Sequence, residues 1–454
     1  MGQVSFEFTA IDSISKAYSA KLANESQLSS FFNKLKQLEN QKRDRVQILH
    51  IGDSHIQAGY MTNYTRTLLQ LRFGNAGMGL VFPYKVAHSN GPNDSYSFSN
   101  IEWDYYRNVN TQDSYDIGIK GHVIATASPS AVLKVSVNPK YGLDYAFNKM
   151  TLFHPKQAKN NTFDVSISKN RELIEESVHE FKAVVYKVQK GDYLIKIAKK
   201  FDTSVSTIKK LNRLKNDLIY IDQKLKIKKR EQWVDKLPFN LFQEIKSNKK
   251  VFNYHTEIQL DTLRDYVFLN KIKTSNPFKK FQIDGIILEN TNSNGLFYHM
   301  IGVNGARVSH YNKQKLFFRQ LPVLKPDLII LSLGTNEIAN NKDSIYDDLD
   351  VFFNTLRNAI GNETPILITT PPDYRRKENK TVSVVSDIIQ YAKLHKYTYL
   401  NIYDALGGKG GMRKLQNKNL AQKDGVHLTA NGYYLVGNLL YKAIMQSYKN
   451  HDSE

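Results

Sequence analysis

The sequence predicts an α/β protein in which helices sandwich a parallel sheet, and in which a β-sandwich insert interrupts that sheet. The insert itself carries a small βααβ module. Three observations support this prediction. Apolar strands alternate with helices towards both ends of the chain, as in a parallel sheet covered on both faces. Short strands of alternating polarity fill the middle, and a β, α, α, β order occupies residues 184–229.

The opening unit of the sheet is predicted near the start of the chain. Apolar residues recur every three or four positions between Gln27 and Arg43, which indicates a helix. The β-type run at 46–51 ends at Gly52-Asp53-Ser54-His55, and a second helix is expected over about 61–73. These elements form one strand–turn–helix unit of the sheet.

The far end of the chain repeats this alternation. The predicted strands are 327–333, 365–369 and 397–403, and the predicted helices are 345–360, 381–395 and 430–448. Ligand sites in such sheets form at the carboxyl ends of the strands. The turns that follow these strands are therefore the first places to look for chemistry.

Antiparallel strands are predicted in the middle of the chain, on either side of the βααβ module. They cover 116–124, 132–137, 162–168, 251–260, 266–272 and 281–288. The module has its own charge pattern, with 13 basic against 4 acidic residues over 184–229. These differences in pattern and charge indicate a sandwich that is inserted into the α/β domain and is itself interrupted.

Composition excludes several classes of protein. The 454-residue chain has no cysteine, which excludes disulfide frameworks, thiolate zinc sites and a cysteine nucleophile. No apolar run reaches the roughly 18 residues of a membrane-spanning helix. The net charge of +20 invites nucleic acid as a partner. Lysines are spread along most of the chain, however, so we expect a solvated basic surface and no nucleic acid partner.

Three short segments, far apart in the chain, carry residues suited to acyl transfer. They are Gly52-Asp53-Ser54-His55, Gly334-Thr335-Asn336-Glu337 and Asp424-Gly425-Val426-His427. A serine hydroxyl needs a general base at neutral pH, and a His with a carboxylate three residues before it supplies one. Each segment alone is also compatible with an ordinary turn or cap. Together they predict a Ser, Asp, His order along the chain.

On these residues the chain resembles the SGNH (GDSL-type) hydrolases, whose four blocks supply Ser, Gly, Asn and His within a flavodoxin-like sheet. The resemblance covers residues 27–78 and about 291–454. It implies a catalytic triad of Ser54, Asp424 and His427. It also implies an oxyanion hole of Ser54, Gly305 and Asn336, with Gly305 taken from the run Gly302-Val303-Asn304-Gly305-Ala306. The branch that acts on peptidoglycan also has His where this chain has His55.

The segment 184–229 resembles a LysM module. Its markers are Tyr186-Lys187-Val188-Gln189-Lys190-Gly191-Asp192, then Leu211-Asn212-Arg213-Leu214 and Gln223-Lys224-Leu225. LysM modules bind glycans that contain N-acetylglucosamine. The resemblance therefore implies a glycan groove near a set of five residues, namely Asp192, Tyr193, Leu194, Leu214 and Ile219.

The two resemblances divide the chain into nested domains. We expect an SGNH hydrolase domain built from two segments, 1–78 and 291–454, a carbohydrate-binding-like β-sandwich at 79–183 and 230–290, and LysM at 184–229. A sandwich inserted before the Gly block resembles the bacterial peptidoglycan O-acetylesterases. The expected partner is accordingly peptidoglycan or another acetylated glycan that contains N-acetylglucosamine.

The resulting hypothesis is a serine esterase that needs no cofactor and no metal. It would remove O-acetyl groups from a cell-wall glycan, with the 6-O-acetyl of N-acetylmuramic acid as the leading candidate, while LysM anchors it to the wall. Such a protein acts in the periplasm or at the cell surface, although the sequence shows no export signal.

Four alternatives remain open from the sequence. A metallophosphoesterase-like site would use Asp53 and His55, but it needs more His and carboxylate ligands. A non-catalytic wall-binding protein would have been free to lose Ser54 and His427. A peptidoglycan O-acetyltransferase would use the same triad in the reverse direction. The acetylated substrate could also be xylan or a capsular polysaccharide.

Overall fold

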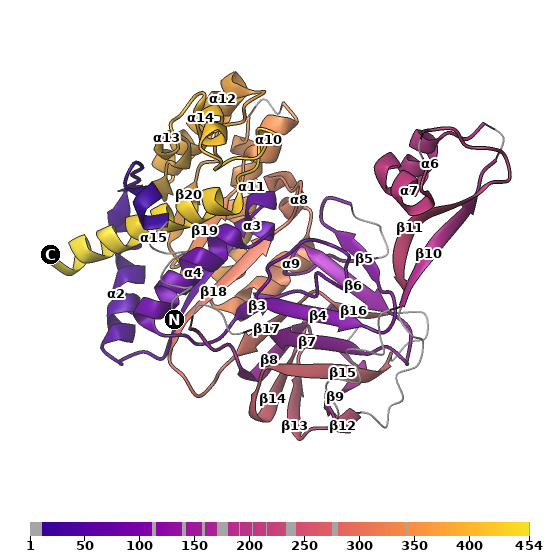
Figure 1. Ribbon diagram of the computed structural model, residues 1–454. Helices are drawn as coiled ribbons and strands as arrows, with labels where there is room; N and C mark the ends of the chain where they lie inside the picture. The colour runs from indigo at the N-terminus through magenta and orange to yellow at the C-terminus, as the bar shows by residue number, and fades with distance from the viewer. Residues whose placement is uncertain are drawn as a thin grey trace.

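The computed structural model describes residues 11–453 except 111–114, 139–141, 157–158, 170–179, 190, 202, 215, 233–241, 275–279 and 342–343 (Figure 1). The first ten residues of the expected N-terminal hydrolase segment, and the stretches next to both expected ends of the LysM module, lie outside the described residues. Within the described residues, no helix is both long enough and apolar enough to cross a membrane.

A six-stranded sheet forms the α/β domain of the molecule. In spatial order its strands are β1 (Leu22–Ala23), β21 (Thr398–Leu400), β20 (Ile366–Thr369), β19 (Leu328–Ser332), β2 (Arg45–Gly52) and β18 (Gly295–Gly302). All pairs are parallel except β1 with β21. The α/β class is thus confirmed, with a mixed rather than a wholly parallel sheet. β2 lies between β19 and β18, so segments from both ends of the chain meet there.

Helices cover both faces of this sheet. They are α2 (Ser29–Glu39), α3 (Ser54–Gln57), α4 (Tyr60–Phe73), α8 (Val308–Asn312), α9 (Lys315–Gln320), α10 (Thr335–Ala339), α11 (Tyr346–Ile360), α12 (Glu378–Leu394), α13 (Ile402–Ala405), α14 (Gly411–Asn417) and α15 (Ala430–Ser453). Two 3-10 turns, η1 (Glu25–Leu28) and η4 (Leu321–Leu324), complete the set.

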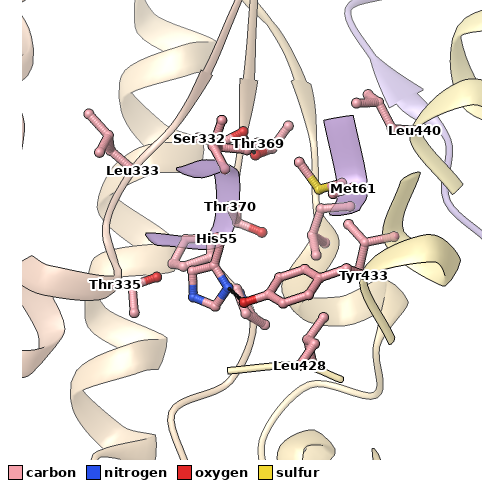
Figure 2. Close-up of a pocket in the computed structure, with 15 residues that line it drawn as sticks. His55, Met61, Ser332, Leu333, Thr335, Thr369, Thr370, Leu428, Tyr433 and Leu440 are labelled. Carbon is pink, nitrogen blue, oxygen red and sulfur yellow. Dashed lines mark hydrogen bonds between the residues drawn. The ribbon is translucent and has the colours of Figure 1, made fainter. Parts of the chain in front are cut away.

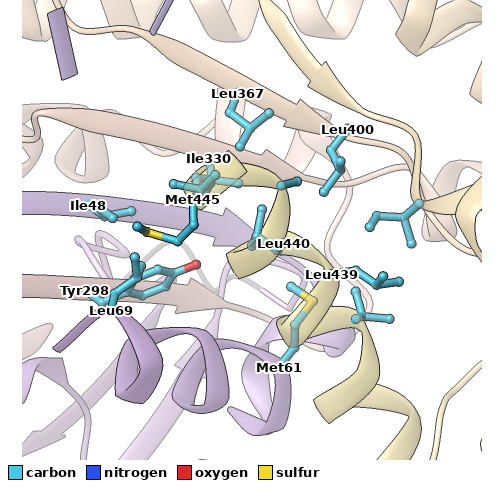
Figure 3. Close-up of a cluster of buried hydrophobic side chains, with 14 of the residues drawn as sticks. Ile48, Met61, Leu69, Tyr298, Ile330, Leu367, Leu400, Leu439, Leu440 and Met445 are labelled. Carbon is cyan, nitrogen blue, oxygen red and sulfur yellow. The ribbon is translucent and has the colours of Figure 1, made fainter. Parts of the chain in front are cut away.

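Alternation along the strands divides the apolar residues between two cores. Ile48 and Ile330 face a core with Leu69 and Leu440, from α4 and α15 (Figure 3). Their neighbours Leu49, Ile329 and Leu331 face a second core under α8, α9, α11 and α12. Fully burying one such side chain stabilises a fold by about 1.5–3 kcal/mol. This continuous burial on both faces holds the strand ends, and the turns on them, in fixed positions.

Antiparallel sheets occupy the middle of the chain. One contains β12 (Phe242–Glu244), β9 (Thr162–Ser168), β15 (Tyr266–Lys273), β7 (Leu133–Val137) and β4 (Ser95–Ser99). A second contains β13 (Ser247–Val251), β14 (His255–Arg264), β8 (Phe147–Phe153), β17 (Gly285–Glu289) and β3 (Gly79–Val81). A third contains β16 (Phe281–Ile283), β6 (His122–Thr126) and β5 (Asp104–Arg107). One apolar cluster, which includes Val135, Met150 and Phe281, joins the three sheets.

A separate β-hairpin with two helices leaves this region (Figure 1). Strands β10 (Glu180–Lys187) and β11 (Lys224–Gln232) pair only with each other among the described strands, and α6 (Leu194–Lys200) and α7 (Val205–Asn212) lie between them in the chain. Seven buried residues, including Ile197, Ile208 and Leu225, form a core of its own. The module therefore folds on local contacts.

Four sequence predictions of strands need correction. The run 251–260 is interrupted, because β13 ends at Val251 and β14 begins at His255. The run 397–403 ends as a strand at Leu400, because the Asn401 side chain accepts a hydrogen bond from Asp404 N–H and starts helix α13. The run 281–288 divides at Asp284, and its halves, β16 and β17, pair in different sheets. The run 116–124 is a strand only from His122. Strand β18, fully buried, is absent from the predicted strands.

Candidate active site

Ser54 lies on a sharp turn between the central strand β2 and the one-turn helix α3. Gly52 closes the strand, and a Cβ there would lie 2.7 Å from the carbonyl oxygen of Ser332, so a larger residue would not fit. Asp53 is the N-cap of α3 and accepts a hydrogen bond from His55 N–H at 3.0 Å. This cap fixes the turn and holds Ser54, half-buried, at the carboxyl end of the sheet.

His427 reaches Ser54 from the other end of the chain. The Ser54 Oγ lies 3.0 Å from His427 Nε2, and His427 Nδ1 lies 2.7 Å from Asp424 Oδ2. The carboxylate can only accept, so Nδ1 carries the proton and Nε2 is left to accept the serine hydroxyl. The three predicted triad residues therefore stand in one hydrogen-bonded line, with the polarity that proton removal from Ser54 requires.

Asp424 is itself held in place by the loop that carries His427. Its Oδ1 accepts the backbone N–H groups of Val426 and His427 at 2.9 and 3.0 Å. Burial alone would raise the pKa of Asp424, but these hydrogen bonds and His427 outweigh it and lower the pKa below its usual value. The carboxylate thus stays ionised at neutral pH, where it can stabilise a protonated His427.

The predicted oxyanion residues Gly305 and Asn336 follow the carboxyl ends of β18 and β19. Gly305 has φ +82° and open space around the position of a Cβ, so its backbone conformation, not crowding, calls for glycine. Asn336 Nδ2 donates to Ala306 O at 2.8 Å and lies 3.4 Å from Asp53 Oδ2. The second contact is long for a hydrogen bond. One amide hydrogen of Asn336 therefore fixes the side chain, and the other is only weakly held.

A buried carboxyl pair lies beneath the oxyanion residues. Burial, with a smaller contribution from the nearby Glu337, raises the pKa of Asp53 to about 7, although the hydrogen bond from His55 N–H opposes this shift. Glu337 is fully buried and accepts Val308 N–H at 2.8 Å. Near neutral pH Asp53 is thus partly protonated, which limits negative charge beside a developing oxyanion.

A small cavity lies between α15 and the ends of β19 and β20 (Figure 2). Its walls include His55, Thr335 and Leu428, the chain neighbours of Ser54, Asn336 and His427. The cavity measures about 40 Å³, and its lining is mostly apolar. Since one water needs about 10–15 Å³ on this measure, there is room for a group of only a few atoms.

Sequence reasoning missed the roles of three residues at this site. His55 Nδ1 lies 3.0 Å from the Tyr433 hydroxyl (Figure 2). The centre of the His55 ring lies 5.4 Å from that of the His427 ring. Burial lowers the pKa of His55 to about 3, so it is neutral and supports His427 without adding charge. Gln57 contacts the turn that carries Gly305. Gln57 follows Ser54 by three positions, so the two side chains lie on the same side of one helical turn, and this spacing could have indicated a role for Gln57. No sequence pattern indicates a role for Tyr433.

The five residues of the predicted glycan groove differ in exposure. Tyr193 is 59 % exposed, whereas Leu194 is 2 % exposed and belongs to the core of the module. The Asp192 carboxylate accepts the Tyr186 hydroxyl at 2.7 Å and the Gln189 N–H at 3.0 Å. Leu214 and Ile219 are partly buried against the core. The Leu194 side chain therefore cannot contact a sugar, because the first turn of α6 directs it inwards.

The metallophosphoesterase-like alternative requires a cluster of metal-binding side chains. Among the residues that the structure describes, no three His, Cys, Asp or Glu side chains gather closely enough to hold a metal ion. Asp53 and His55, the candidate metal ligands of the alternative interpretation, instead bind backbone and Tyr433.

Two family models match separate regions of the chain. The model of the GDSL-like lipase/acylhydrolase family matches residues 288–435, and the LysM domain model matches residues 186–228. The α/β region thus contains a serine-esterase domain of the acylhydrolase class. Specifically, the chain combines a GDSL-like lipase/acylhydrolase domain with a LysM domain, as the sequence motifs predicted.

Individual proteins are similar to the fold or to parts of the chain. The fold is similar over 94 % of the chain to a structure described as "Peptidoglycan O-acetylesterase in action, 5 min", with 99 % of that chain covered, 18 % identity and a TM-score of 0.62. A lipase/acylhydrolase from Enterococcus faecalis matches 34 % of this chain and 77 % of that chain, with 20 % identity and a TM-score of 0.26. The probable peptidoglycan endopeptidase LytE of Bacillus subtilis (strain 168) is 58 % identical over 43 residues, which are 10 % of this chain and 13 % of LytE.

Proposed function

We propose that the protein is a serine esterase that removes O-acetyl groups from a cell-wall glycan. The single observation that carries the chemistry is the 3.0 Å contact between Ser54 Oγ and His427 Nε2. Serine becomes a nucleophile when a neutral imidazole, oriented by a carboxylate, is within reach of its hydroxyl. Asp424 supplies that carboxylate at 2.7 Å.

The reaction starts when His427 Nε2 takes the proton of Ser54 Oγ, which attacks the ester carbonyl carbon. The negative charge that develops on the carbonyl oxygen is received by the N–H groups of Ser54 and Gly305 and by the Asn336 amide. Each such donor is typically worth about 3–4 kcal/mol of transition-state stabilisation. His427 then returns the proton to the departing sugar oxygen, and water repeats the sequence on the acyl-enzyme.

An acetyl group is the acyl group that best fits the surroundings of Ser54. The cavity between α15 and the ends of β19 and β20 holds only a few atoms, and its lining is mostly apolar. A methyl group matches both properties, and we infer that the acyl group points into this cavity, whose lining includes the buried residues Leu428 and Tyr433. This supports acetyl esters over longer esters as substrates.

Peptidoglycan is the glycan that the similarities favour. A protein described as a peptidoglycan O-acetylesterase shares the fold over nearly the whole chain, and the LysM relative is a probable peptidoglycan endopeptidase. On this basis the substrate is the 6-O-acetyl of N-acetylmuramic acid, and the protein works outside the cytoplasm, in the periplasm or at the cell surface. The expected domain division, with a carbohydrate-binding-like sandwich at 79–183 and 230–290, belongs to this proposal.

The LysM domain holds the enzyme on the wall in this scheme. Of the five predicted groove residues, Tyr193, Leu214 and Ile219 supply side chains, while Asp192 and Leu194 contribute backbone only. Exposed neighbours add apolar area, since Ile195 is 66 % and Tyr220 is 65 % exposed. Large exposed apolar patches of this kind mark interaction sites.

The test is acetate release from O-acetylated peptidoglycan compared with acetylated xylan, using the full chain and its Ser54→Ala variant. We expect release from peptidoglycan that depends on Ser54 and is faster than release from xylan. Faster release from xylan would move the substrate to another polysaccharide. Acetyl transfer to a glycan acceptor without net acetate would favour an O-acetyltransferase, and inactivity on every ester would leave a wall-binding protein.

A further inference from the structure

The turn that carries Gly305 is held by a triangle of amide side chains. The backbone N–H of Asn304 donates to Gln57 Oε1 at 2.6 Å, and Asn304 Nδ2 donates to Asn90 Oδ1 at 2.7 Å. Gln57 Nε2 donates to Asn90 O at 2.8 Å and to Asn90 Oδ1 at 3.0 Å, and Gln57 is 0 % exposed. Gln57 thus uses both ends of its amide to join the turn to Asn90.

Gln57 is the last residue of α3, the one-turn helix that Ser54 begins. The end of β18 packs directly on it, because a Cβ at Gly302 would lie 2.4 Å from Gln57 N. The Ser54 N–H and the Gly305 N–H are two of the proposed oxyanion donors. The Gln57 side chain therefore links the helix that carries the first donor to the turn that carries the second.

Asn90 lies in the segment that follows β3, outside the α/β domain, and other residues of the insert bind the same strand end. β18 is an edge strand among the described strands. The carbonyls of its residues Met300 and Gly302, and of Asn304 in the turn that follows, accept hydrogen bonds from the insert. The donors are Lys120, His122 and Arg107; His122 Nε2 is 3.0 Å from Gly302 O, and Arg107 Nη1 is 3.4 Å from Asn304 O. The insert thus binds every second residue of the segment from Met300 to Asn304, which leads to Gly305.

The hydrogen-bond partners of His122 fix the position of its ring proton. Its Nε2 donates to a carbonyl, so its Nδ1 accepts from the Tyr105 hydroxyl at 2.8 Å. Burial lowers the pKa of His122 to about 3. The ring is therefore neutral at working pH, with one tautomer set by its partners.

We propose that Gln57 is a positioning residue for the oxyanion turn, and that the β-sandwich insert acts with it through Asn90. The insert is then a component of the catalytic apparatus as well as a glycan-facing domain. The inference rests on the proposed esterase function. Oxyanion donors act because they are held in place before the reaction, and an error of about 1 Å in placement can cost about 100-fold in rate.

The test measures hydrolysis of a small acetyl ester by the full chain and by Gln57→Leu. We expect kcat to fall by about 10–100-fold with KM nearly unchanged, since the side chain acts on transition-state donors rather than on the ester. The inhibition constant of methylboronic acid, which forms a tetrahedral adduct on serine, should rise by a similar factor. A merely structural role would not move this constant. Gln243→Leu, on an exposed side chain of β12, is the matched control.

Asn90→Ala provides a second variant in case Gln57→Leu does not fold, because Asn90 is exposed. We expect the same pattern at a smaller size, about 3–10-fold in kcat and in the boronate constant. Wild-type values of both quantities in Asn90→Ala and in any folded Gln57→Leu would overturn the inference alone. An inactive wild type would contradict the proposed function itself, and the inference with it.

Discussion

The catalytic site and the glycan groove of the LysM module were both predicted from short sequence motifs. In the structure the predicted triad residues come together, whereas the predicted groove residues do not all face solvent. The triad residues Ser54, Asp424 and His427 lie within hydrogen-bond distance of one another, although Ser54 and His427 are 373 positions apart in the chain. In the module the predicted groove residues come from two short stretches, 192–194 and 214–219, and one of them, Leu194, belongs to the core. Chemistry that needs a particular atom identifies its residue by type, whereas a binding surface depends on which way each side chain points.

The largest effect should follow from removing the nucleophile. Ser54→Ala is expected to reduce kcat for acetyl ester hydrolysis by at least about 10⁴-fold, since no other group supplies the attacking oxygen. The free energy of unfolding should change little, because Ser54 is only half-buried. Pull-down by insoluble peptidoglycan should stay at the wild-type level. If turnover persisted in a variant shown by mass spectrometry to be pure, the triad assignment would be wrong.

A smaller loss is expected when the orienting carboxylate is neutralised. Asp424→Asn can still hold Val426 N–H, but it no longer stabilises a protonated His427. We expect kcat to fall by about 10²–10⁴-fold, the range of general-base assistance. Steady-state kinetics at several pH values measure this loss. A change of less than about threefold would show that His427 works without its partner.

Deleting residues 184–229 separates the two regions. The module has its own core and pairs only through β10 and β11, so the remaining domains should fold and hydrolyse small esters at the wild-type rate. Binding to insoluble wall should drop to background. Sedimentation with peptidoglycan and an ester assay on the same sample measure both. Loss of both properties would show that the module supports the fold.

Adjacent residues of the module sharpen the comparison further. Leu194→Ala should reduce the free energy of unfolding of the module by about 2–5 kcal/mol, because it leaves a cavity in the core. Tyr193→Ala, on a side chain 59 % exposed, should change stability by less than about 0.5 kcal/mol and still weaken glycan binding. Chemical denaturation and binding to chitin oligomers are the two measurements. Equal stability losses would mean that Tyr193 is a core residue too.

The last prediction concerns how stability depends on pH through the buried Asp53. Its pKa is raised to about 7, so the folded state keeps a proton that the unfolded state releases above about pH 4. This residue therefore makes the wild type less stable as the pH rises from 4 to 7. Asp53→Asn lacks the effect. We expect the difference in unfolding free energy, variant minus wild type, to increase by roughly 2–3 kcal/mol between pH 5 and pH 8. A pH-independent difference would mean that Asp53 is ionised throughout.

Much of the fold follows from the periodicity of apolar residues. Where periodicity failed to predict the structure, the physical reason can be identified. The continuous apolar runs at β19 and β20 are typical of buried strands and were predicted as such. The division of 281–288 depends on Asp284, whose buried carboxyl is held by Gln282 and Gln320. Hydrogen bonds between remote residues leave no local pattern in the sequence. The same reason hides Tyr433, which lies six residues after His427 in the chain.

The site shows the same division. Ser54 and His427 are residue types that acyl transfer requires, so the motifs predicted them, and the two side chains lie 3.0 Å apart. Gln57 and Asn90 form hydrogen bonds with Asn304, in a turn that is distant from both in the sequence, so these contacts are visible only in the folded chain. The sequence therefore predicts the reacting groups, while the residues that position them are found from distances.

Covalent labelling of the intact protein tests the central claim most directly. A fluorophosphonate reacts only with a serine whose hydroxyl is activated by a neighbouring base. Peptide mapping by mass spectrometry should find one adduct per chain, on Ser54, and no adduct in the His427→Ala variant. Ester hydrolysis that continues with Ser54 unlabelled, or an adduct on a different serine, would contradict the proposed mechanism.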